Sequence, residues 1–186
     1  MTAGYSGFML HHLITHISPT ILVATLLLAA ALAQQSSSPL LFLPAGVQLL
    51  AGFVYGLRSV PGGTLGLGFG MALLTHQALT TDTLSLWLLY GALSTLCLVG
   101  FIHLVCRFGH IDDQLYGLNF RHVLIVVALQ AVFDAALRTG LAPGLNTHLE
   151  HPLMQQWLIQ ATGNLLGSMA IAFSLWALAS LRHRRI

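Results

Sequence analysis

Long apolar runs alternate with short polar breaks along the chain, and this pattern predicts an all-α integral membrane protein. A helix that crosses a bilayer needs about 20 mostly apolar residues, because each residue advances the helix by about 1.5 Å. By this criterion we expect a polytopic bundle of about six transmembrane helices with short loops. The expected helices cover Ile14–Ala33, Leu40–Leu57, Gly62–Leu79, Leu84–Val105, Phe120–Leu137 and Leu153–Leu181.

The polar breaks are too short to fold separately, so we expect residues 1–186 to form a single transmembrane domain. Residues 1–13 could instead form an interfacial amphipathic segment. Residues 182–186 are interpreted as a basic cytoplasmic tail. The N-terminus lacks the basic region and the cleavage site of a signal peptide, so we interpret it as mature sequence.

Glycines spaced four residues apart occur in three of the apolar runs. Such glycines share one helical face and allow two helix backbones to approach closely. The predicted helix-packing glycines are Gly52, Gly56, Gly62, Gly66, Gly70, Gly163 and Gly167. We expect them to pack helices within one subunit, and the alternative is a seam between the subunits of a homo-oligomer.

The composition supports the membrane interpretation. Hydrophobic residues make up 56% of the chain and charged residues 6%, and the mean hydropathy is +0.81. These are too few charges to cover a soluble globule of this size. The net charge of +2 is small and scattered, so we expect membrane lipid and a membrane or cytoplasmic protein as partners, and no nucleic acid.

The arginines predict an orientation in the bacterial inner membrane. If both termini are cytoplasmic, the only arginine near the outer surface is Arg138. Such an asymmetry follows the positive-inside rule. Trp87 and Tyr90 then lie near the outer end of one helix, where we expect aromatic side chains at the level of the lipid headgroups. The arginines on the inner side are Arg58, Arg107, Arg121, Arg182, Arg184 and Arg185.

Ten histidines in 186 residues are the most unusual feature of the composition. They fall in two layers, with candidate metal or haem ligands at His16, His103 and His122 near the inner face and at His76, His148 and His151 near the outer face. Imidazole binds zinc, copper and haem iron. The histidines could also serve as interfacial or hydrogen-bonding groups, or as a proton relay. The cofactor therefore stays open between none, haem and a transition metal.

Asp134 is a lone acid in an apolar run, where an unpaired carboxylate costs several kcal/mol. Arg138 is four residues further on and can pair with it on the same helical face. The alternative is a contact with a ligand or another helix, to which Gln130 on the same face contributes. The residues expected to shape an interior ligand cavity are Pro44, Gly46, Gln130, Asp134 and Arg138. The chain lacks GxSxG, HExxH and phosphate-loop motifs, so we predict no catalytic residues and consider an enzyme less well supported than a binding protein.

One stretch of about thirty residues resembles a known family. It resembles the proline- and glycine-punctuated helix pair of bacterial membrane-associated sensor domains of the MASE type, with a weaker similarity at Arg121-His122. The resemblance implies a membrane sensing module that signals through a separate protein. The residues that carry it are Leu43-Pro44-Ala45-Gly46-Val47, Leu50, Tyr55-Gly56, Pro61-Gly62 and Leu65-Gly66.

Three functional hypotheses follow from the sequence. The first is a stand-alone membrane sensing or ligand-binding module that acts through a partner protein. The second is a haem- or metal-binding electron carrier that uses the two histidine layers. The third is an accessory subunit of a larger membrane complex, which would suit the short loops.

Overall fold

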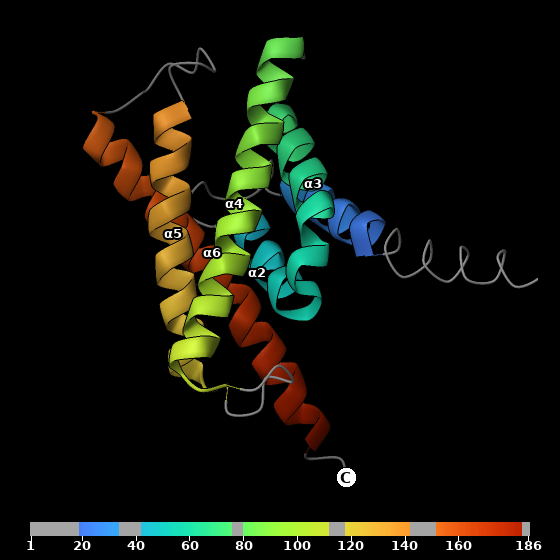
Figure 1. Cartoon of the computed structure of the whole chain (residues 1–186), viewed down its shortest axis with the longest axis vertical. Helices are drawn as coiled ribbons and strands as arrows, with labels where there is room; N and C mark the ends of the chain where they lie inside the picture. Colours follow the sequence, from blue (N-terminus) through green and yellow to red (C-terminus); the bar gives the residue numbers. More distant parts are fainter. Residues whose placement is uncertain (1–18, 34–41, 76–79, 112–117, 142–151, 184–186) are drawn as a thin grey trace, which may run out of the picture.

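The computed structural model describes residues 19–33, 42–75, 80–111, 118–141 and 152–183, with side chains up to residue 174 in the last of these segments (Figure 1). All regular structure in these segments is helical, which confirms the all-α class. The helices are Pro19–Ala33, α2 (Leu43–Tyr55), the 3-10 turn η1 (Gly56–Arg58), α3 (Ser59–Leu74), α4 (Thr81–Phe108), α5 (Phe120–Leu141) and α6 (Leu153–His183).

The prediction of about six transmembrane helices is wrong. Within the described part of the chain, two helices, α4 and α5, are long and apolar enough to cross a membrane. Helices α2 and α3 contain 13 and 16 residues. At about 1.5 Å per residue, α2 covers about 20 Å, whereas the hydrocarbon core is about 30 Å thick. The apolar run that begins at Leu40 does not form one long helix, because α2 ends at Tyr55, just before Gly56, whose φ is +54°.

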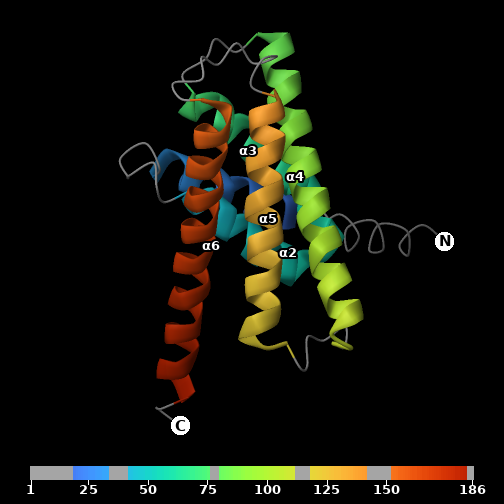
Figure 2. The ribbon, with the colours of Figure 1, turned by 90° about the vertical axis from the view of Figure 1, so that its left-hand side faces the viewer.

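The three long helices α4, α5 and α6 run along the length of the molecule, and α2 and α3 lie beside them (Figures 1 and 2). The end of α4, the start of α5 and the end of α6 lie at the same end of the bundle in both views. Thr80 begins α4 with a capping box, in which its hydroxyl accepts from the Thr83 N–H and the Thr83 hydroxyl accepts from the Thr80 N–H. Asn119 caps α5, because its side-chain oxygen accepts from the His122 N–H at 3.3 Å.

The glycine ladder of α3 lies against the helix Pro19–Ala33. A Cβ added at Gly62 would lie 2.6 Å from the Thr20 carbonyl oxygen, and one at Gly66 would lie 2.9 Å from the Ala24 carbonyl oxygen. At Gly70 the nearest atom would be the Ala31 Cβ at 2.9 Å. The two backbones therefore approach too closely for larger side chains on this face of α3.

Helix α2 is held between α4 and α6 in the same way. A Cβ at Gly52 would lie 2.9 Å from the Ile102 side chain of α4, and one at Gly46 would lie 2.6 Å from the Gly167 carbonyl oxygen of α6. Gly163 is buried in α6, and its carbonyl oxygen accepts a 3.0 Å hydrogen bond from the N–H of Phe42, just before α2. Gly56 has nothing within 4 Å of an added Cβ. Gly56, which was predicted to pack helices together, instead allows the turn of the backbone at the end of α2.

Trp87 and Tyr90 lie inside the bundle, so the prediction that they are interfacial aromatics is wrong. Each is 1% exposed, and their rings meet edge to face at 5.8 Å. They pack with Phe42, Ala45 and Met71 in one hydrophobic cluster. This face of α4 therefore packs against α2 and α3.

Candidate functional site: a buried polar chain across three helices

Gln48 is the central residue of a polar chain inside the apolar bundle. It lies in the middle of α2 and is fully buried. Its Nε2 donates to the Ser94 Oγ at 2.8 Å and to the Thr95 Oγ1 at 3.1 Å, both on α4. The Thr95 hydroxyl donates in turn to the Gly91 carbonyl oxygen at 2.8 Å. One end of the chain is therefore bonded to α4.

The chain continues from Gln48 to α5. The Nε2 of Gln130 donates to the Gln48 Oε1 at 2.9 Å. Gln48 thus uses both ends of its amide, and it joins α4 to α5 although neither partner is near it in the sequence. Hydrogen bonds of this kind between apolar helices contribute about 0.6 kcal/mol each on average.

The other end of the chain has three acceptor atoms without a donor. These are the Gln130 Oε1 and the Asp134 Oδ1 and Oδ2, and none of them has a hydrogen-bond partner. Gln130 is 2% exposed and Asp134 is 1% exposed, so water does not reach them from the surface. The Ser94 and Gln130 side chains act on the Asp134 carboxylate as hydrogen-bond donors and favour its charged form, although neither makes a hydrogen bond of standard geometry to it. An unsatisfied buried polar group costs about 1–3 kcal/mol, and more when it is charged.

Arg138 does not bond to Asp134, although it is one turn further along α5. The Asp134 oxygens accept no hydrogen bond, and the Arg138 guanidinium carbon lies 5.8 Å from the centre of the Phe42 ring. A cation over an aromatic face is stabilised by about 0.5–2 kcal/mol, depending on its exposure. Arg138 therefore links α5 to the start of α2 in place of the intrahelical pair expected as one alternative.

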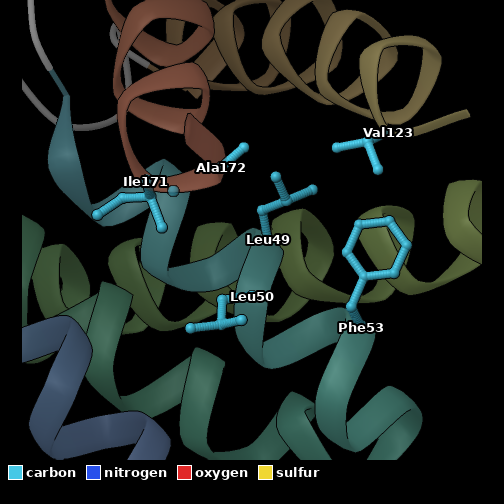
Figure 3. A pocket seen from close by; sticks show the side chains of 7 residues that line it. Leu49, Leu50, Phe53, Val123, Ile171 and Ala172 are labelled. Atoms are coloured by element: carbon cyan, nitrogen blue, oxygen red, sulfur yellow. The ribbon is translucent and has the colours of Figure 1, made fainter. Parts of the chain in front are cut away.

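The five predicted cavity residues do not line one described pocket together. Gln130 and Asp134 belong to the polar chain, and Arg138 lies at its margin. Pro44 is buried in the first turn of α2, where the missing proline N–H costs no hydrogen bond. Gly46 lines a separate apolar pocket of about 170 Å³ between α2, α5 and α6 (Figure 3). The other lining residues are Leu49, Leu50, Phe53, Val123, Ile171 and Ala172.

The described segments contain two of the six candidate metal or haem ligands. His103 is exposed on α4, and His122 is half-buried at the start of α5, where its Nδ1 accepts from the Asn119 N–H at 3.3 Å. The described residues include no group of three or more histidine, cysteine, aspartate or glutamate side chains that could hold a metal ion. The candidates His16, His76, His148 and His151 lie outside the described residues.

Sequence reasoning did not find Gln48, Ser94 and Thr95 as site residues. Their hydrogen bonds join positions 46 and 47 residues apart, and the bond between Gln48 and Gln130 spans 82 residues. A signal was nevertheless present, because Gln48 is the one strongly polar side chain in the apolar segment 43–55. A buried amide in such a segment requires a partner, but the sequence does not identify it.

No protein-family model, curated protein or solved structure matches the chain. The chemistry of the polar chain therefore follows from its own donors and acceptors. All three unpartnered atoms are acceptors, so only a hydrogen-bond donor or a cation could satisfy them.

Proposed function

We propose that this protein is an integral membrane sensing or ligand-binding module, and that its ligand binds at Gln130 and Asp134. The observation that carries the proposal is the buried polar chain with three unpartnered acceptors at one end. Ionisable residues inside membrane helices are costly, and they commonly occur at ion, proton or ligand sites. A binding site also explains why the chain tolerates acceptors that destabilise the empty protein.

The outer surface of the bundle supports a membrane location. In the most apolar stretch of α4, 33% of the residues are buried inside the fold, and the same share is buried in the most apolar stretch of α5. The remaining two thirds are partly or largely exposed and include several large apolar side chains, which need lipid or another protein as their surroundings. Among these exposed side chains are Leu89, Leu96, Leu104, Phe108, Ile125, Leu129 and Val132.

The arginines support an orientation in the inner membrane. Arg107 is in the last turn of α4 and Arg121 in the first turn of α5, and these helix ends lie together at the end of the bundle where α6 also ends (Figure 2). Arg138 is in the last turn of α5, at the other end. By the positive-inside rule, the end with Arg107 and Arg121 is cytoplasmic.

A separate partner would receive the signal, as the resemblance to MASE-type sensor domains also suggests. A route out of the site exists at Phe42, which contacts Arg138 of α5 and bonds to Gly163 of α6. A change at Asp134 that moved Arg138 would therefore act on the contact between α2 and α6. Co-purification from solubilised membranes is the measurement that identifies such a partner.

The binding role is tested by the thermal unfolding of the detergent-purified protein in alkaline buffer, in which carboxylates are ionised. Asp134→Leu removes two unpartnered acceptors, so we expect it to stabilise the protein by about 1–3 kcal/mol. Gln48→Leu is the matched control, because Gln48 is equally buried but fully bonded, and we expect it to destabilise the protein by a similar amount. If Asp134→Leu lowers the stability as Gln48→Leu does, Asp134 has a structural role and the proposal is wrong.

A further inference from the structure

A second pocket lies between the last turns of α4 and the first turns of α5, and we refer to it as the α4/α5 groove. It has a volume of about 340 Å³. A cavity of about 150 Å³ holds one benzene molecule, so the groove has room for a longer stretch of hydrocarbon. None of its lining residues belongs to the polar chain. Its apolar lining residues are Leu104, Val105 and Phe108 of α4 and Ile125 and Leu129 of α5.

The walls of the groove form part of the apolar surface of the bundle. All of the apolar lining residues except Val105 are exposed, and Phe108 is 76% exposed. Lipid acyl chains are as apolar as leucine side chains, so they suit these walls. In a protein that lies in a membrane, hydrocarbon from the bilayer is therefore the occupant that the walls favour.

His122 places a hydrogen-bond donor at one end of the groove, where it and Gly109 complete the lining. Its Nδ1 accepts from the Asn119 N–H at 3.3 Å, so in the neutral ring the hydrogen is on Nε2. A Cβ added at Gly109 would lie 3.1 Å from this Nε2 atom. The Nε2 therefore lies against the end of α4, and the missing side chain of Gly109 leaves space beside it.

Two exposed arginines flank the groove at the same end. Arg107 is three residues after Leu104 on α4, and Arg121 is four residues before Ile125 on α5, so each lies one turn from a lining residue. This is the end of the bundle where α4 ends and α5 begins (Figure 2). The partial charges of the two helix ends oppose one another, so among the described residues the arginines determine the sign of the local charge. A basic pocket between membrane helices on the cytoplasmic side is typical of sites that bind anionic lipid headgroups.

We infer that the α4/α5 groove binds an anionic phospholipid. An acyl chain of the lipid lies between α4 and α5, and its phosphate faces Arg107, Arg121 and the Nε2 of His122. Guanidinium groups form charge-assisted hydrogen bonds with phosphate oxygens. A zwitterionic phospholipid brings the same hydrocarbon and phosphate but adds a cation, which the two arginines repel. This site goes beyond the proposed function, because it does not involve Gln130 or Asp134.

Native mass spectrometry of the full chain in a neutral detergent tests this inference, because it resolves bound lipids by their mass. The probes are phosphatidylglycerol and phosphatidylcholine with the same acyl chains. One basic side chain near an anionic lipid changes the affinity by about fivefold, so we expect phosphatidylglycerol to bind at least about tenfold more tightly than phosphatidylcholine. Arg107→Gln and Arg121→Gln should each weaken the binding of phosphatidylglycerol by about fivefold. Arg58→Gln is the matched control, because Arg58 is also exposed but lies in η1, outside the groove, and it should leave this affinity unchanged.

A second pair of variants tests the contact with hydrocarbon. Leu104 and Leu96 both belong to α4 and are both 46% exposed, but only Leu104 lines the groove. Leu104→Trp fills the groove, and losing the contact of even one methylene group should weaken the binding of both lipids by about fourfold. Leu96→Trp should bind both lipids as the wild type does. Melting curves followed by circular dichroism show which variants are folded, and the arginine variants keep the test decisive if Leu104→Trp is not.

Three results would overturn the inference. The first is equal affinity for the two lipids, or arginine variants that bind as the wild type does, which is expected if Asp112 and Asp113, outside the described residues, neutralise the arginines. The second is displacement of phosphatidylglycerol by inorganic phosphate with no effect of Leu104→Trp, which would identify an anion site in place of a lipid site. The third is a dimer of the wild type that Leu104→Trp abolishes, which would assign the groove to a second copy of the chain.

Discussion

Replacing Gly167 with alanine should separate α2 from α6. An added Cβ would collide with the carbonyl group of Phe42 and would lie 3.1 Å from the Phe42 nitrogen. These are backbone atoms, so they cannot move aside as a flexible side chain could. The Phe42 N–H also donates to the Gly163 carbonyl oxygen at 3.0 Å, one turn away. Relieving the collision therefore weakens this hydrogen bond.

The expected loss of stability follows from three effects. Overpacking at a close contact costs about 1–3 kcal/mol, and the weakened hydrogen bond costs about 1 kcal/mol. Alanine in place of glycine within a helix returns about 1 kcal/mol through its higher helix propensity. We therefore expect Gly167→Ala to destabilise the protein by about 1–3 kcal/mol, which is a large change for a single methyl group.

Gly100 provides the matched control, because it lies within α4 and an added Cβ would have nothing within 4 Å. Gly100→Ala should stabilise the protein by up to about 1 kcal/mol through helix propensity alone. The two variants and the wild type are compared by reversible unfolding in mixed detergent, with circular dichroism as the measured signal. Equal stabilisation by both substitutions would refute the close contact between α2 and α6.

Three further substitutions test other parts of the fold. Thr80→Ala removes the cap of α4 and should lower the stability by about 1 kcal/mol in the same unfolding assay. Gly56→Ala should cost about 1–3 kcal/mol although the space around Gly56 is open, because its φ of +54° and ψ of −132° are strained for any other residue. Gly52→Ala pushes against Leu98 of α4, one turn from Gln48, so a double-mutant cycle of Gly52→Ala with Gln48→Leu should show a coupling of at least about 0.5 kcal/mol; additive effects would contradict a shared contact.

Apolar runs and polar breaks predicted where the helices lie, because helix formation depends largely on residues that are close together in the sequence. The expected starts at Phe120 and Leu153 agree with α5 and α6. The lengths of the short helices could not be predicted in the same way. The run from Leu40 to Leu57 is apolar throughout, but the helix is interrupted at Gly56 by a backbone conformation that hydropathy does not describe. Hydropathy therefore overestimated the number of helices able to span a membrane.

The candidate site was predicted in part, for a related reason. Gln130 and Asp134 stood out because they are polar side chains four residues apart in one apolar helix. Their connection to Gln48 depends on how three helices pack, and the hydropathy pattern does not show which helix faces contact each other. The same limit explains Trp87, whose amphipathic ring suits a membrane interface equally well but is 1% exposed inside the bundle.

The short helix α2 connects the glycine contacts with the polar chain. Gln48 is a residue of moderate length, and it bonds to both α4 and α5 from the position of α2 against α4 and α6. Gly52 is one turn from Gln48 on the same face and allows this position, since a Cβ there would lie 3.1 Å from the Leu98 side chain of α4. A helix long enough to cross the bilayer would have to continue past Gly56 on the same axis. The early end of α2 is therefore compatible with its role, which is to place one amide between two longer helices and not to span the membrane.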